Sequence, residues 1–243
     1  MQRRTLRPAA LPPGLTLAAL LVTTAPALAA SAWDDAAPTA MDDTSYHVPV
    51  IRNDVVTIFR IDILPGRTSG YHIHDRDQLC VVVDNYPPEA YSQPLGGPPG
   101  PPRKAEPGEV SYVAYFGQPI THKAINPGSI ANRSICAVFN GPKPLGVEAG
   151  TRDPLYRQVL DNPRARAWRL TLQPGQSAPS IRQPAPALRV IIGGGEIAEL
   201  LPGGRERGMA IRQGDFFWKE AGAMRGIRNI GRTPVDLVEI EFK

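Results

Sequence analysis

Residues 66–78 read GRTSGYHIHDRDQ, and with THKAIN at 121–126 they decide the fold of this chain. Three of its four histidines lie in these two stretches. Alternate residues of a β-strand point to the same face, so His72 and His74 project together. Imidazole nitrogens bind Fe, Mn, Ni, Cu and Zn, and His122 would add a ligand from a distant strand. The pattern therefore predicts a divalent metal site with open positions for water or a substrate.

Short β-branched and aromatic segments recur between Gly and Pro turns, while helical periodicity is almost absent, which predicts an all-β fold. The segments that read as strands are 54–64, 79–85, 109–116, 134–140, 167–172, 188–194, 214–220 and 235–242. Two stretches rich in Pro and Gly, 86–109 and 141–166, read as connections. The first is either a lid or a passive insertion. The second marks a domain boundary, with room for one helical turn at 154–160.

Residues 1–30 have the features of a secretory signal peptide, namely a basic start, an apolar run at 15–22 and the small-residue sequence Ala27-Leu28-Ala29. The pair Arg3-Arg4 resembles a twin-arginine signal, and an ordinary basic start is the alternative. Because the apolar run is too short to span a bilayer, we expect a periplasmic or secreted protein without a membrane partner after cleavage. Residues 31–45 read as a flexible N-terminus.

The charge of the expected mature chain is nearly balanced. Removal of residues 1–30 takes away three arginines and no acidic residue, which lowers the formal net charge from +4 to +1. Nucleic acids and anionic membranes both require clustered Lys and Arg, so the charge gives no case for either partner. The hydrophobic content of 42% argues against a disordered chain.

The histidine segments resemble the cupin family, whose first motif reads G-x5-H-x-H-x3,4-E-x6-G and whose second reads G-x5-P-x-G-x2-H-x3-N. The resemblance implies a jelly-roll β-barrel that holds one divalent metal ion, with Fe as the first candidate and Mn, Ni, Cu or Zn as alternatives. The matching positions are Gly66, His72, His74, Gln78 and Asn85 in the first motif, and Gly108, His122 and Asn126 in the second.

Two departures from the family pattern affect what the resemblance implies. Gln78 replaces the glutamate of the first motif, which removes the one anionic ligand. Gln78 is therefore expected either to bind the metal through its amide oxygen or to hydrogen-bond a ligand. Gly117 and Pro119 occupy each other's expected positions, so the resemblance does not fix the strand register near them. Residues 75–77 are expected to form a solvated turn.

The second half of the chain repeats the motif spacing without the metal ligands. Its motif positions include Gly175, Gly194, Gly214, Gly222 and Asn229. The ligand positions carry Ile181, Gln183, Ala187 and Arg225, a set that no divalent metal would choose. Arg225 and Gln183 could form an anion site in this half, and the alternative is an arginine neutralised by a nearby Glu.

The resemblance thus implies two jelly-roll barrels in tandem after the signal peptide. The metal-binding barrel is expected at 46–146, a linker at 147–165 and a degenerate barrel at 166–243. The resemblance also places Cys80 and Cys136 on neighbouring antiparallel strands, which permits a disulfide in an oxidising compartment. A free Cys80 pointing toward the metal site is the alternative.

Three neutral histidines would leave the full 2+ charge on the metal, which favours a small anionic chelating ligand such as an enediol, enolate, catecholate or thiol-carboxylate. Three-histidine cupins resemble non-haem dioxygenases, and the alternative is a non-enzymatic periplasmic protein that binds a metal or a small ligand. No general base can be placed from the sequence, because the ligand pattern contains no Glu and no Lys or Glu can be placed near the metal. His47 lies outside every motif and is expected to be structural or exposed. Cupins tend to pair through their outer sheets, so a homodimer is also expected.

Overall fold

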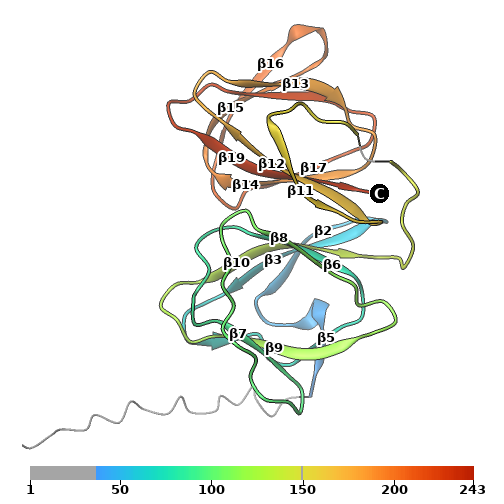
Figure 1. The fold of residues 1–243 in the computed structure, drawn as a ribbon, viewed down its shortest axis with the longest axis vertical. Coiled ribbons are helices and arrows are strands. Elements are labelled where there is room, and N and C mark those ends of the chain that lie inside the picture. Colours follow the sequence, from blue (N-terminus) through green and yellow to red (C-terminus); the bar gives the residue numbers. More distant parts are fainter. Residues whose placement is uncertain (1–36, 149) are drawn as a thin grey trace, which may run out of the picture.

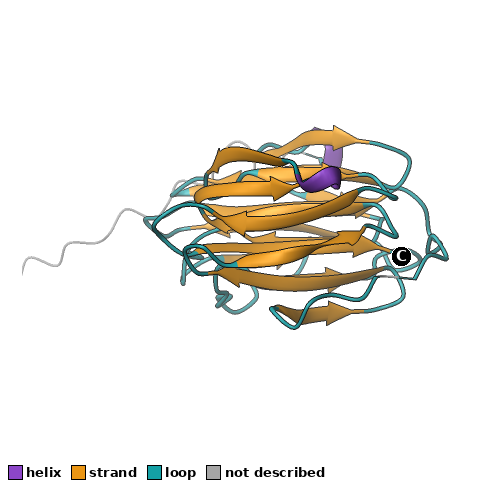
Figure 2. Cartoon of the chain, turned by 90° about the horizontal axis from the view of Figure 1, so that it is seen from above, coloured by secondary structure: helices purple, strands orange, loops and turns teal. Residues whose placement is uncertain are grey.

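The computed structural model describes residues 37–148 and 150–243, and the expected signal peptide lies outside these residues. Figure 1 shows two β-barrels stacked on each other, and Figure 2 shows their strands running side by side with loops at both ends. The helices in the described residues are two short 3-10 turns, η1 (Met41–Asp43) and η2 (Pro202–Gly204). None of the described helices is long and apolar enough to cross a membrane. The expected all-β fold with two jelly-roll barrels is confirmed.

The first barrel consists of two sheets. One has the strand order β1-β5-β9-β4, with β7 also paired to β9, and the other has the order β2-β3-β10-β6-β8. The strands are β1 (Thr39–Ala40), β2 (His47–Arg52), β3 (Val56–Ile63), β4 (Arg67–Thr68), β5 (His72–His74), β6 (Gln78–Val82), β7 (Tyr91–Pro94), β8 (Val110–Val113), β9 (Ile120–Asn126) and β10 (Asn132–Phe139).

The second barrel repeats this arrangement with the sheets β11-β12-β19-β14-β17 and β13-β18-β15-β16. Its strands are β11 (Tyr156–Asp161), β12 (Ala165–Leu172), β13 (Ser177–Arg182), β14 (Ala187–Gly193), β15 (Gly195–Leu200), β16 (Glu206–Ile211), β17 (Phe216–Lys219), β18 (Met224–Asn229) and β19 (Val235–Phe242).

One asparagine in each barrel makes the same set of hydrogen bonds. The Asn126 amide nitrogen donates to two backbone carbonyls at 2.8 Å each, and its oxygen accepts from the N–H of Gly128. Asn229 repeats both donations at 2.8 Å and accepts from the N–H of Gly231. Both asparagines are fully buried. The repeated motif therefore has a structural role in the barrel without ligands as well as in the barrel with histidines.

The barrels share a hydrophobic core between their facing sheets. Alternate side chains of β3, β6 and β10 pack there against those of β12, β14 and β19. The Phe242 ring lies 5.7 Å from that of Phe139 in the first barrel and stacks on Trp218 at 5.6 Å. Because the interface is a core rather than a polar contact, we expect the two barrels to depend on each other for stability.

Two connections expected to be irregular contain strands. Residues 154–160, read as room for a helical turn inside the 147–165 linker, contribute to β11, which pairs antiparallel with β12. A short apolar run in a sequence does not distinguish a helix from a strand. Here the segment forms a strand because it pairs with the otherwise open edge of β12. In the Pro-rich connection, β7 forms at the sheet edge, where a proline is tolerated.

The expected flexible N-terminus, 31–45, is ordered where it is described. Thr39 pairs with His72 in a parallel bridge between β1 and β5. The Met41 side chain is 4% exposed and packs in a cluster with Phe59. This segment therefore supports the strand that carries two of the predicted metal ligands.

Asp77, in the turn expected to be solvated, is buried instead. Its carboxylate accepts hydrogen bonds from the Tyr112 hydroxyl at 2.7 Å and from the backbone N–H groups of Tyr115 and Phe116 at 2.9 and 3.0 Å. Arg164 of the second barrel reaches the same carboxylate at 3.4 Å. Asp77 thus fixes the loop after β8 and links the two barrels.

Candidate metal centre

The three motif histidines converge inside the first barrel. In the β5–β9 pair, His72 lies directly opposite His122. The Nε2 atom of His74 lies 2.9 Å from the Nε2 of His72 and 2.9 Å from the Nε2 of His122. The structure therefore brings together the trio expected from the sequence, and its ligating atoms all lie within 4.8 Å of one another.

Groups outside the trio fix two of the three rings. The Nδ1 of His72 lies 3.0 Å from the carbonyl oxygen of Gly70, and because a carbonyl only accepts, Nδ1 carries the proton and Nε2 keeps its lone pair. The Nδ1 of His122 lies 2.6 Å from the Ser92 hydroxyl on β7. The Nδ1 of His74 is buried without a hydrogen-bond partner among the described residues. Partners of this kind orient ligating histidines.

Burial makes all three imidazoles neutral at physiological pH. It lowers the pKa of His74 to about 2, with a further contribution from the neighbouring His122 and His72. Burial likewise lowers the pKa of His122 to about 4 and lowers that of His72. Neutral imidazole is the form that binds metal ions, so the site needs no deprotonation before it binds one.

The donor set fits a divalent ion. Two nitrogen donors at right angles, each about 2.1 Å from a metal, are about 3.0 Å apart, close to the observed Nε2 separations. Gln78 lies against His74, and its Oε1 is buried without a hydrogen-bond partner among the described residues. Its Nε2 donates to the Cys80 sulfur. An unpaired acceptor beside His74 is an arrangement that a bound cation would satisfy.

His47 also lies in this site, which the sequence did not indicate. Its side chain is 6% exposed, and its ring centroid is 4.7 Å from that of His72. Burial, with a further contribution from His72, lowers the pKa of His47 to about 3. The pairing of β2 with β3 places it here, opposite Ile61. No motif records that pairing, although the alternation in the strand could have suggested an inward direction.

The four histidines line one cavity of about 310 Å³. Connection 86–109 forms part of its wall through Tyr86, Tyr91, Ser92 and Arg103. Among the described residues that line the cavity, Arg103 is the one with a charged side chain, and none is acidic. The remaining lining residues are Ile61, Ile63, Gln78, Cys80, Gly100, Pro101, Ser111, Val113, Tyr115, Ala124, Asn132, Ser134 and Cys136.

Several solved structures share the fold of this chain. AerE from Microcystis aeruginosa superposes with a TM-score of 0.56 at 13% identity, covering 82% of this chain and 98% of its own. Salicylate 1,2-dioxygenase from Pseudoaminobacter salicylatoxidans, solved as adducts with gentisate, superposes with a TM-score of 0.52 at 12% identity. The match covers 77% of this chain and 68% of the dioxygenase chain. A cupin 2 conserved barrel domain protein from Leptotrichia buccalis superposes with a TM-score of 0.50 at 9% identity, covering 81% of this chain and 88% of its own. The chain has the cupin fold. No protein-family model and no curated protein sequence matches it.

The two cysteines of the chain form a disulfide. Cys80 on β6 lies directly opposite Cys136 on β10, with their Cα atoms 4.1 Å apart. The expected disulfide is confirmed and the alternative of a free Cys80 thiol is wrong, although both residues line the cavity. The disulfide is therefore part of the wall of the candidate metal centre.

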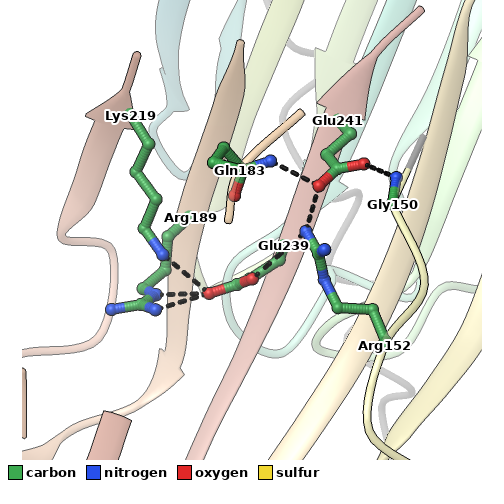
Figure 3. Close-up of polar contacts among 7 residues, drawn as sticks. All are labelled: Gly150, Arg152, Gln183, Arg189, Lys219, Glu239 and Glu241. Atoms are coloured by element: carbon green, nitrogen blue, oxygen red, sulfur yellow. Dashed lines mark hydrogen bonds and ion pairs between the residues drawn. The ribbon is translucent and has the colours of Figure 1, made fainter. Parts of the chain in front are cut away.

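The interior of the second cupin barrel contains a buried ionic network instead of histidines (Figure 3). Glu239 accepts from Arg189 Nε at 2.8 Å and from Lys219 Nζ at 2.9 Å. Glu241 is paired with Arg152 and accepts from the N–H of Gly150 at 2.7 Å. The arginine and lysine side chains in this network are almost fully buried, and each is paired with Glu239 or Glu241.

Gln183 belongs to this network and is not free to bind a ligand. Its amide nitrogen donates to the carboxylate of Glu241, and the residue is 4% exposed. Arg225 lies in β18 opposite Ile181, the same cross-strand position that His122 takes opposite His72 in the first barrel. This register supports the correspondence of the two motif sets. The expected anion site at Gln183 and Arg225 remains a prediction for Arg225, whereas Gln183 is already paired.

Proposed function

We propose that this cupin is a metal-dependent enzyme of the dioxygenase type that oxidises a small anionic chelating molecule in the first barrel. The observation that carries the proposal is the convergence of His72, His74 and His122 in a cavity, with their Nε2 atoms directed at one another. The fold does not require three converging imidazoles, because the second barrel adopts the same fold without them.

The electrostatics of the cavity support an anionic ligand. Neutral imidazoles would leave the 2+ charge of the ion uncompensated, and none of the described lining residues is acidic. Arg103 adds a positive charge at the wall, although it is half-exposed and paired with Glu109 at 2.9 Å. A volume of about 310 Å³ is sufficient for a small organic molecule. The salicylate 1,2-dioxygenase neighbour, solved with gentisate, has a ligand of this class.

Each group of this chain has a defined task in the proposed reaction. His72, His74 and His122 would hold the ion, with Gln78 proposed as the fourth ligand through its orphaned Oε1. A bound redox-active ion, proposed as iron, would supply Lewis acidity and electron transfer to O₂. The Gly70 carbonyl keeps the His72 lone pair directed inward, and the wall formed by residues 86–109 limits access of water.

Export to the periplasm or beyond is part of the proposal. The Cys80–Cys136 disulfide supports it, because such bonds persist in oxidising compartments and are rare in the cytosol. The basic start and apolar run within residues 1–30 point in the same direction.

The test is O₂ uptake by metal-loaded protein with a panel of chelating anions that includes salicylate, gentisate, catechol and enediols. We expect consumption of O₂ with at least one of them, lost in the matched His122→Ala variant. Stoichiometric binding of these anions without O₂ consumption under Fe, Mn, Ni or Cu loading would reject catalysis and favour the non-enzymatic binding protein.

A further inference from the structure

We propose that His47 is a specificity-determining residue that accepts a hydrogen bond from a ligand hydroxyl next to the metal. The site would then select chelators that bind through a hydroxyl oxygen, such as 2-hydroxy acids and ortho-hydroxybenzoates, over their methyl ethers. The inference rests on the metal-binding part of the proposed function and is independent of O₂ chemistry.

His47 is built into the barrel interior. It is the first residue of β2, it lies opposite Ile61 of β3, and both residues line the cavity. Its ring centroid is 4.7 Å from that of His72, while its nitrogens are not part of the group of ligating atoms that lie within 4.8 Å of one another. His47 therefore lies beside the ligand set and is not a member of it.

One hydrogen bond fixes the tautomer of the His47 ring. The Nδ1 of His47 lies 3.3 Å from the carbonyl oxygen of Ser45. Because a carbonyl only accepts, Nδ1 must donate, and in the neutral ring Nε2 is then a pure acceptor. Within residues 37–148 and 150–243, this Nε2 has no hydrogen-bond partner. An unpaired acceptor is thus available on a residue that lines the cavity.

A chelator that binds a metal through a hydroxyl oxygen keeps a polar O–H that must find an acceptor once water is excluded. No carboxylate among the described lining residues can serve, and the lining serines can use their hydroxyls as donors as well as acceptors. A site built to pair with a ligand O–H rejects the analogue that lacks it, because a buried polar group is then left unpaired. His47 supplies this discrimination.

The experiment measures anaerobic binding of salicylate and 2-methoxybenzoate to Co²⁺-loaded protein, by calorimetry and by the visible Co²⁺ spectrum. Wild type is expected to bind salicylate at least about tenfold more tightly than its methyl ether. His47→Phe keeps a ring but removes the acceptor, and it should reduce this preference to near unity through loss of salicylate affinity alone. His47→Gln, which retains an acceptor, should keep part of the preference and provides the answer if His47→Phe does not fold.

The metal content of each variant, measured by elemental analysis, separates the alternatives. We expect both His47 variants to retain one Co²⁺ per chain with an unchanged ligand-free spectrum. Loss of the ion would identify His47 as a metal ligand and overturn the proposal. Equal loss of both probes, unchanged preference, or binding of neither probe by metal-loaded wild type would also overturn it. If wild type binds no metal, both this inference and the proposed function are wrong.

Discussion

Gln78 has a buried amide oxygen in the position where a carboxylate would neutralise part of the metal charge. Gln78→Glu should therefore tighten binding of a divalent cation by about tenfold or more and weaken binding of an anionic chelator. Gln78→Leu, of similar size, should weaken metal binding. Calorimetric titration of metal and of salicylate measures both effects. Unchanged affinities for both in Gln78→Glu would place the residue outside the ligand set.

Glu239 gives a pH-dependent prediction. Burial alone would raise its pKa, but Lys219 and Arg189 hold it far below its ordinary value. The native carboxylate thus stays ionised at a pH where the unfolded chain takes up a proton, so its contribution to stability is complete above about pH 4.3 and is lost as the pH falls further.

Glu239→Gln should therefore destabilise the protein at pH 7 by about 3 to 5 kcal/mol, because the buried Arg189 and Lys219 lose the carboxylate that accepts their hydrogen bonds. The loss of stability on acidification should also become shallower. Urea unfolding between pH 3 and 7 measures both effects, with Glu206→Gln in the exposed pair with Arg228 as the control. Equal behaviour of the two variants would show that the network contributes nothing.

Among individual residues, the sequence predicted those that a short motif identifies. His72 and His74 share a face through strand alternation, and His122 followed from its own motif. His47 and Asp77 could not be assigned, because each meets its partners only through strand pairing or through loops far away in the chain. The charge network was hidden for the same reason, since a glutamate in a strand usually faces solvent.

Among the elements, the pairing of β6 with β10 gives the strongest prediction, because it places Cys80 opposite Cys136. The bond closes a loop with a sequence separation of 56 residues, worth about 3 to 4 kcal/mol on the chain-entropy model. The double variant Cys80→Ala/Cys136→Ala should lose this stability in urea unfolding. Thiol titration of unfolded, unreduced wild type should find no free thiol, and two free thiols per chain would refute the bond.

The eight segments read as strands from composition and turn residues correspond to β3, β6, β8, β10, β12, β14, β17 and β19, whereas β1, β7 and β11 form in segments expected to be irregular. Each of these three is short or lies at an edge, and each forms because a neighbouring strand offers unpaired backbone groups. Their sequences contain Pro, Ala or mixed polar residues with weak strand preference. Pairing with neighbouring strands therefore determines that these segments form strands.

For the whole molecule, the shared core predicts one cooperative unfolding transition. Phe242→Ala should destabilise both barrels together by about 3 to 5 kcal/mol, because the ring is fully buried between Phe139 and Trp218. Differential scanning calorimetry of wild type and variant measures this, and Leu64→Ala at an exposed site is the control. Two separate transitions, with only one affected, would contradict the shared core.

The central claim is that the first barrel alone binds a metal ion, since the second barrel fills its interior with paired charges. The most direct measurement is the metal content per chain of purified wild type, His72→Ala and His122→Ala by elemental analysis. The account predicts one divalent ion per chain in wild type and none in either variant. Two ions per chain, or a stoichiometric ion in either variant, would contradict it.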